Sequence, residues 1–335
     1  GVLDIDDAFP LDPSETQDSD GDGEGDNRDG FPDDSTRIYV DLATALANLP
    51  DDAFRACVQN ASNGLASVAD VKSIYCGNKS SIRSISGIEA FIELSSLDIH
   101  DTRTGDLAPL TYLTKLTNLK VSQGGVGNEI SSFEPLRYLW RLEELSISGG
   151  SSADWSIVKR FRQLKWLRIG GGNNFLGASV AYDLLEGLEL EFLEISDSET
   201  TVLPDLSDSA DSLRIVHAIG NQLNDINALS GLTNLNQLRL DNNQITDISG
   251  LSGLTNLNQL WIGNNQITDI SGLSGLTNLR SLYLYGNQIT DISGLSGLTN
   301  LRSLYLYGNQ ITDISGLSGL TNLRSLYLYG NQITD

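Results

Sequence analysis

The residues with the clearest potential for chemistry lie near the start of the chain, in an acidic stretch rich in glycine. Residues 18–29 read DSDGDGEGDNRD, with carboxylates at mostly alternate positions. Ca²⁺ prefers oxygen ligands, and glycine permits the sharp turn that brings successive carboxylates around one ion. A solvated acidic linker is the simpler alternative, but it does not require the DxDxDG spacing. The sequence therefore predicts a calcium site with these candidate ligands: Asp18, Asp20, Asp22, Glu24, Asp26 and Asp29.

Part of the same pattern occurs one period upstream. Gly1 to Asp4 corresponds to residues 23–26, and the Phe-Pro pair at residues 9–10 corresponds to the pair at residues 31–32. This adds Asp4 and Asp7 as candidate calcium ligands. The motif and its Phe-Pro pair resemble the thrombospondin type 3 repeat. The resemblance implies that residues 1–37 form an irregular, calcium-bound segment, which serves as a stiff stalk while the metal offsets carboxylate repulsion.

The framework of the chain is a repeat of 22 residues. The units from Leu276 and Leu298 are identical, LTNLRSLYLYGNQITDISGLSG. A fixed period of this length predicts a solenoid, in which each unit is buried against its neighbours. Alternating apolar residues, such as Leu238 and Leu240, predict a strand with one buried face. The apolar residues that follow at intervals of three predict a short helical turn on the opposite side.

The spacing LxxLxLxxNxIxxIxxL within each unit resembles the leucine-rich repeat, and the segment DISGLSGLTNL resembles its internalin-type class. The resemblance implies an α/β solenoid, a horseshoe with a parallel sheet on the concave side and short helical turns on the convex side. Twelve units can be followed, from Val71 to Leu323. The family also implies that the recurring asparagine, from Asn221 to Asn331, is buried and bonds the backbone of adjacent turns.

The two ends of the repeat array differ. Residues 38–90 are predicted to form a helical cap and the first repeat, with Asp51 or Asp52 at the start of a helix. Residues 91–335 are predicted to hold the remaining leucine-rich repeats and to be open at the C-terminal end, since the last unit copies the interior ones.

The chain has two cysteines, one on each side of the interface between cap and repeats. Cys57 falls on the predicted cap helix, and Cys76 falls at an inward position of the first repeat. This placement favours a disulfide between them, with two buried free thiols as the alternative. The calcium motif indicates an extracellular setting, and such a setting supports the disulfide.

A candidate binding face follows from the repeat geometry. Residues that flank the inward leucines of a strand point out of the concave sheet. In the last three repeats these residues include two aligned columns of tyrosine, a residue type that often anchors protein interfaces. Copying of one tolerated tyrosine pair by duplication is the alternative explanation, and a sugar polymer is the alternative ligand. The candidate residues are Arg239, Asp241, Trp261, Tyr283, Tyr285, Tyr305, Tyr307, Tyr327 and Tyr329.

The composition narrows the classes of function. The net charge of −23 disfavours nucleic acid and anionic membranes as partners, because both need a basic surface. No apolar run approaches the roughly 20 residues of a membrane span. Enzyme signals are lacking: the two histidines, His100 and His217, fall in different repeats, and there is no Cys/His cluster suited to zinc.

These observations predict a recognition or adhesion module of a secreted or cell-surface bacterial protein. The module would bind a protein partner through the concave face, with Ca²⁺ as the cofactor of its stalk. Two alternatives remain open. One is a structural subunit of a self-assembling surface filament or spacer, and the other is a glycan-binding or targeting module of a larger secreted enzyme.

Overall fold

The computed structural model describes residues 41–123, 130, 132–148, 154–170 and 183–334. The predicted calcium segment, residues 1–37, lies outside the described residues. The chain forms two compact units. The first unit comprises Gly1–Glu143 and Ser152–Arg160, and the second comprises Glu144–Ser151 and Phe161–Asp335.

The described part of the first unit begins with two short helices, α1 (Leu42–Ala47) and α2 (Asp52–Ala61). The carboxylate of Asp51 accepts a hydrogen bond of 2.9 Å from the backbone N–H of Phe54. This bond satisfies one of the free amides in the first turn of α2. Of the two residues proposed at the start of this helix, Asp51 is therefore the one that caps it.

Asp51 also connects the cap to the first repeat. Its Oδ2 atom accepts hydrogen bonds from the backbone N–H groups of Arg83, at 2.8 Å, and Ser84, at 3.2 Å. Partial burial acts to raise the pKa of Asp51, but the backbone N–H groups of Arg83, Phe54 and Ser84 together hold it below its usual value. The Asp51 side chain thus caps α2 and also bonds the backbone of a turn more than thirty residues away.

The predicted disulfide is present in the structure. Cys57 of α2 is bonded to Cys76, which follows the first strand, and their Cα atoms are 5.9 Å apart. The described residues of the first unit contain three parallel strands that pair in sequence order: β1 (Ser73–Tyr75), β2 (Ser96–Thr102) and β3 (Asn118–Gln123). Its 3₁₀ turns are η1 (Val68–Asp70), η2 (Ile88–Ala90), η3 (Ala108–Leu110), η4 (Glu134–Tyr138) and η5 (Trp155–Arg160).

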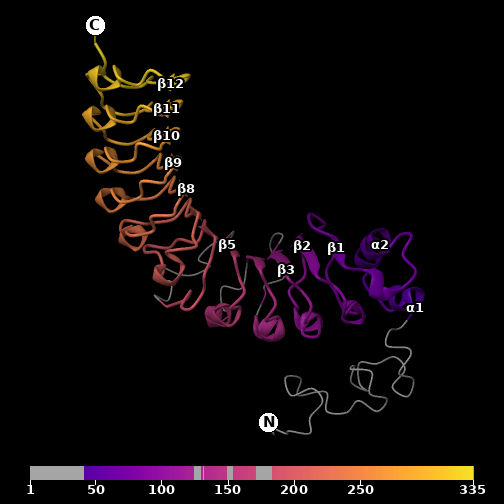
Figure 1. The fold of residues 1–335 in the computed structure, drawn as a ribbon. Helices are drawn as coiled ribbons and strands as arrows, with labels where there is room; N and C mark the ends of the chain where they lie inside the picture. Colours follow the sequence, from indigo (N-terminus) through magenta and orange to yellow (C-terminus); the bar gives the residue numbers. More distant parts are fainter. Residues whose placement is uncertain (1–40, 124–129, 131, 149–153, 171–182, 335) are drawn as a thin grey trace. The chain divides into compact units, whose positions relative to one another are not determined.

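The described residues of the second unit contain nine parallel strands, each paired with the next in sequence order. In Figure 1 the strands β8 to β12 lie one above another, with the 3₁₀ turns on the opposite side. The strands are β4 (Glu144–Ile147), β5 (Trp166–Gly170), β6 (Phe192–Ser196), β7 (Ile215–His217), β8 (Gln237–Arg239), β9 (Gln259–Trp261), β10 (Ser281–Tyr283), β11 (Ser303–Tyr305) and β12 (Ser325–Tyr327). The 3₁₀ turns are η6 (Ser207–Ser209), η7 (Asn227–Leu229), η8 (Ser249–Leu251), η9 (Ser271–Leu273), η10 (Ser293–Leu295) and η11 (Ser315–Leu317).

The core of each repeat consists of the apolar residues that define its spacing. In the repeat that contains β10, Leu279, Leu282 and Leu284 are fully buried. The last repeat differs, since Leu326 is 42% exposed whereas the equivalent Leu304 is fully buried. The predicted solenoid of strands and short turns, with a helical cap, is confirmed.

The asparagine ladder satisfies the backbone polar groups of the buried turns. Asn265 accepts a hydrogen bond of 3.0 Å from the backbone N–H of Ile245, and its Nδ2 atom donates to the carbonyl oxygens of Leu240, Ile262 and Gly263. Each unpaired backbone group in this position would cost free energy, because water does not reach it. The ladder joins each turn to the one before it, and the predicted structural role of these residues is confirmed.

Candidate functional site

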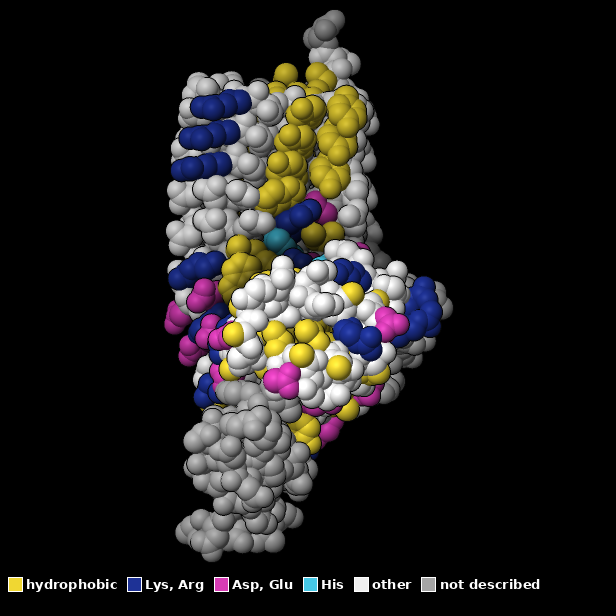
Figure 2. Space-filling view, turned by 90° about the vertical axis from the view of Figure 1, so that its right-hand side faces the viewer, with side chains coloured by type: hydrophobic (Ala, Val, Ile, Leu, Met, Phe, Trp, Pro, Cys, Tyr) yellow, Lys and Arg dark blue, Asp and Glu magenta, His cyan; other side chains and the backbone are white. Residues whose placement is uncertain are grey.

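Aromatic side chains form two columns on the solvent-facing side of the sheet in the second unit (Figure 2). The buried leucine between them, such as Leu284, points into the core, so its two neighbours point outward. Backbone pairing sets the register, because Trp261 lies opposite Tyr283, and each later tyrosine lies opposite the next. The first column consists of Trp261, Tyr283, Tyr305 and Tyr327, and the second of Tyr285, Tyr307 and Tyr329.

Within each column the rings stack face to face. Centroid distances are 4.4–5.0 Å in the first column and 4.6–4.9 Å in the second, with interplanar angles from 7° to 15°. Neighbouring rings therefore cover each other's faces and leave their edges at the sides of the columns. A sugar that stacks on an aromatic side chain needs a free ring face, so this arrangement does not favour the glycan alternative.

Asp241 does not lie on the exposed face as predicted, since only 2% of the residue is exposed. The cause is Gly263, at the equivalent position one repeat later. A Cβ atom on Gly263 would lie 2.4 Å from the ring of Tyr285, so the glycine leaves the space that this ring occupies. The Tyr285 hydroxyl donates a hydrogen bond of 3.1 Å to Oδ1 of Asp241. Asp241 therefore positions Tyr285 and is not accessible to a large ligand.

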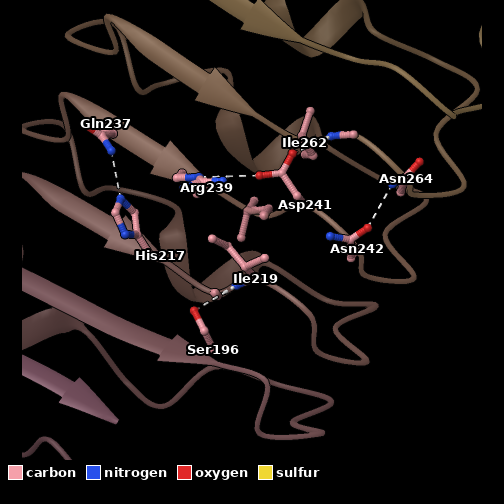
Figure 3. A network of polar contacts seen from close by, with 12 residues as sticks. Ser196, His217, Ile219, Gln237, Arg239, Asp241, Asn242, Ile262 and Asn264 are labelled. Atoms are coloured by element: carbon pink, nitrogen blue, oxygen red, sulfur yellow. Dashed lines mark hydrogen bonds and ion pairs between the residues drawn. The ribbon is translucent and has the colours of Figure 1, made fainter. Parts of the chain in front are cut away.

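Electrostatics at this end of the second column favour a neutral phenol. Burial, the nearby charge of Asp241 and the hydrogen bond to it raise the pKa of Tyr285 to about 12. Burial also raises the pKa of Asp241, partly offset by the Tyr285 hydrogen bond and by Arg239. The ion pair between Arg239 Nε and Asp241 Oδ2 spans 3.6 Å (Figure 3). At this distance it is not a hydrogen bond, and neither atom has another hydrogen-bond partner among the described residues.

Upstream of Trp261 the first column continues as charged and polar residues. Arg239 lies opposite Trp261 in the sheet, and its guanidinium carbon is 5.3 Å from the centroid of the indole ring. This cation–π contact joins the charged part of the column to the aromatic part. The predicted site residues Arg239 and Trp261 thus belong to one continuous row of side chains.

Two residues in the upstream part of the first column were not among the predicted site residues. Glu194 and His217 occupy the repeat position of Trp261 on β6 and β7, so the repeat offset alone could have identified them. Glu194 forms an ion pair of 2.9 Å with Nε of Arg168, and its Oε2 atom lies 3.6 Å from Nδ1 of His217. Burial acts to raise the pKa of Glu194, but His217 and Arg168 together hold it below its usual value. Gln237 in turn contacts Nε2 of His217 at 2.8 Å (Figure 3).

The other histidine belongs to the first unit. His100 Nδ1 lies 2.5 Å from Oδ1 of Asp98, and its Nε2 lies 2.9 Å from Nδ2 of Asn78. In the described part of the chain, no group of three or more histidine, cysteine or carboxylate side chains is arranged to hold a metal ion. The candidate calcium ligands between Asp4 and Asp29 lie outside the described residues. None of the described helices combines the length and apolar character needed to cross a membrane.

Comparison with known proteins supports the repeat assignment. The family model for leucine rich repeats (2 copies) matches the chain in five overlapping segments, at residues 211–253, 233–275, 255–297, 277–319 and 299–335. Residues 211–335 are leucine-rich repeats. No curated protein sequence matches the chain.

Solved structures with the leucine-rich repeat fold resemble the chain over most of its length. An internalin (inlF) from Listeria monocytogenes is 29% identical with a TM-score of 0.75, covering 87% of this chain and 87% of the internalin. A leucine-rich repeat protein of Leptospira interrogans is 23% identical with a TM-score of 0.64, covering 88% and 83%. The plant peptide hormone receptor RGFR1, in complex with RGF2, is 20% identical with a TM-score of 0.58, covering 78% and 44%. The last two similarities concern the fold alone.

Proposed function

We propose that the chain is a recognition module that binds a protein partner through its two aromatic columns. The observation that carries this proposal is the alignment of Trp261 and six tyrosines on the solvent-facing side of the sheet. Tyrosine and tryptophan often supply most of the binding energy of a protein interface. Because each ring already stacks on at least one neighbouring ring, binding costs little side-chain entropy.

Several observations favour a protein over a glycan as the partner. The ring faces are covered within the columns, so the surface offers edges and hydroxyl groups instead of stacking platforms. Aromatic edges and phenol hydroxyls suit the mixed apolar and polar surface of a protein. The similarity to an internalin also favours recognition over catalysis.

The setting that we propose is extracellular or on the surface of a bacterial cell. The disulfide between Cys57 and Cys76 supports this setting, since such bonds persist in oxidising compartments. The spacing of carboxylates over residues 18–29 supports a calcium-stiffened stalk. Calorimetric titration of the full chain with Ca²⁺ tests the stalk. Replacement of Asp18, Asp20 and Asp22 by Asn should remove the heat of binding, and equal heat from the variant would contradict the site.

Binding of the full chain to an array of purified extracellular proteins tests the proposed function. The variant Tyr305→Ser/Tyr307→Ser removes the middle ring from the last three tyrosines of each column. The control Gln288→Ala/Gln310→Ala changes exposed residues outside the columns. We expect the native chain to bind one or more proteins of the array. The control should still bind these proteins, and the tyrosine variant should not. Array partners that bind all three proteins equally would contradict the proposal.

A further inference from the structure

Beside the aromatic columns lies a row of three arginines. Arg280, Arg302 and Arg324 each directly precede a strand of the last three repeats. Their backbones are bonded to each other: the N–H of Arg302 donates to the carbonyl of Arg280, and that of Arg324 to the carbonyl of Arg302, both at 2.8 Å. Since neighbouring strands lie about 4.8 Å apart, the three side chains begin in a fixed line. Figure 2 shows basic side chains in parallel beside the two columns.

No anionic side chain in the described part of the chain pairs with these arginines. All three residues are exposed, and none makes a side-chain hydrogen bond or ion pair within the described parts of the chain. Residues 276–334 contain two carboxylates, Asp291 and Asp313. Each lies beyond the end of its strand and accepts a hydrogen bond of 2.8 Å from the backbone N–H of a serine at the start of a 3₁₀ turn. The cations and the carboxylates of these repeats are therefore on separate parts of the surface.

The row is unusual in a chain with a net charge of −23. Like charges at strand spacing lie well within the Debye length of about 8 Å at physiological salt, so they repel each other. A ligand with several negative groups at a similar spacing would relieve this repulsion. Guanidinium groups suit that role, because they bind carboxylates through two parallel N–H donors.

The surface between the arginines and the rings also offers hydrogen-bond donors and positive potential. Ser281, Ser303 and Ser325 lie between the row and the first column and carry hydroxyl groups. The stacked tyrosines present their ring edges, which carry partial positive charge, together with their hydroxyl groups. The whole strip therefore offers donors and positive potential next to apolar area, and it suits a ligand that is both anionic and partly apolar.

We propose that the arginine row and the aromatic columns together bind an acidic segment of the protein partner. Its carboxylates would pair with Arg280, Arg302 and Arg324, and its apolar side chains would pack along the ring edges. A sulfated glycan could supply the negative charge, but it lacks apolar side chains for the columns and finds no free ring faces within them. This inference rests on the proposed function and specifies the chemistry of the partner.

Fluorescence anisotropy with a labelled copolymer of glutamate and tyrosine tests the inference on the full chain. The row variant is Arg280→Glu/Arg302→Glu/Arg324→Glu. The control Lys79→Glu/Arg83→Glu/Arg160→Glu makes the same change in net charge at exposed residues of the first unit. We expect saturable binding to the native chain that weakens with salt. Binding should fall by about tenfold or more in the row variant and by less than about threefold in the control, since only the row loses local charge pairs.

Two results would overturn the inference. One is equal binding of the copolymer to the native chain and the row variant, and the other is binding of heparin without binding of the copolymer. Binding of the variants to the proteins identified on the array then distinguishes failure of this inference from failure of the proposed function. If they bind the row variant normally but fail to bind Tyr305→Ser/Tyr307→Ser, the arginine row is irrelevant and the aromatic site stands. If they bind both variants normally, both proposals are contradicted.

Discussion

The Tyr285 hydroxyl donates a hydrogen bond of 3.1 Å to the carboxylate of Asp241, which lies two repeats upstream. The intervening position is Gly263, and the tyrosine ring occupies the space that a side chain there would fill. This contact fixes the first ring of the second column. Since Tyr307 and Tyr329 stack on it in turn, the position of the whole column depends on one buried carboxylate and one glycine.

Replacing Gly263 by Ala should disturb this arrangement. The added Cβ would lie 2.4 Å from the Tyr285 ring, so the ring must move and its hydrogen bond to Asp241 must weaken. We expect a loss of about 1–3 kcal/mol of stability, typical of overpacking at a buried site. The control is Gly253→Ala, since nothing lies within 4 Å of a Cβ there. Equal urea midpoints for the two variants would show that Tyr285 does not depend on Gly263.

The ionisation of Tyr285 provides a second test of the same contact. Burial and Asp241 raise its pKa from 10.0 to about 12. The unfolded chain thus releases the phenol proton at a lower pH than the folded chain does. The folded state therefore loses stability as the pH rises from 10 toward 12. At about pH 11, between the two values, Tyr285 should still be protonated. Absorbance at 295 nm should then rise equally in the native chain and in Tyr285→Phe. An excess of one phenolate in the native chain would contradict the contact.

Asn265→Ala should destabilise the chain more than Gln266→Ala. The side chain of Asn265 is buried and makes four hydrogen bonds to backbone groups. Gln266 is exposed, and the hydrogen bond from its backbone N–H to the carbonyl oxygen of Ile245 does not involve its side chain. Leaving buried backbone groups unpaired costs about 1–3 kcal/mol. Urea unfolding followed by circular dichroism measures the difference. If the two midpoints coincide, the ladder does not stabilise the repeats.

Asp51→Ala should loosen the cap in a way that depends on pH. Loss of a helix N-cap costs about 0.5–2 kcal/mol, and here the bonds to Arg83 and Ser84 are lost as well. Because the pKa of Asp51 is lowered in the fold, its contribution is present above the unfolded value of 3.8 and disappears as the pH falls through the folded value.

Thermal unfolding of this variant across the acidic range checks the prediction. The difference from the native chain should be full near neutral pH and small well below pH 3.8. The control is Asp52→Ala, which removes a side chain that is 91% exposed and forms a surface ion pair with Arg55. A constant difference at every pH, or an equal effect of Asp52→Ala, would show that the Asp51 carboxylate does not hold the cap.

Much of the fold could be predicted because one local rule is repeated. Inward residues such as Leu282 and Leu284, and the ladder residue Asn287, recur at fixed offsets. Residues at the same position of adjacent repeats therefore pack against each other. The disulfide was predictable because Cys57 falls on the cap helix and Cys76 at an inward position of the first repeat, on the two sides of one interface. In these cases the relevant contact lies within one repeat or between elements that are adjacent along the chain.

Apart from Glu194 and His217, which follow from the repeat offset, the features that were missed depend on side-chain reach across several elements. Burial of Asp241 requires Tyr285 to extend over Gly263, a contact between repeats that are not adjacent. The bonds from Arg83 and Ser84 to Asp51 join residues from different local structures. Stacking of the rings, which covers their faces, depends on side-chain rotamers that spacing alone does not specify.

The most direct test of the central claim is the affinity of the strongest array partner for single variants along the first column. Interferometry with the full chain gives the dissociation constants. Tyr283→Ala, Tyr305→Ala and Tyr327→Ala should weaken binding by about tenfold or more at one or more positions, since truncation of an anchor residue costs about 2 kcal/mol. Gln288→Ala and Gln310→Ala should change it by less than about threefold, as expected for residues outside an interface. Unchanged affinity in all three tyrosine variants, or a larger loss in the glutamine variants, would contradict recognition through the aromatic columns.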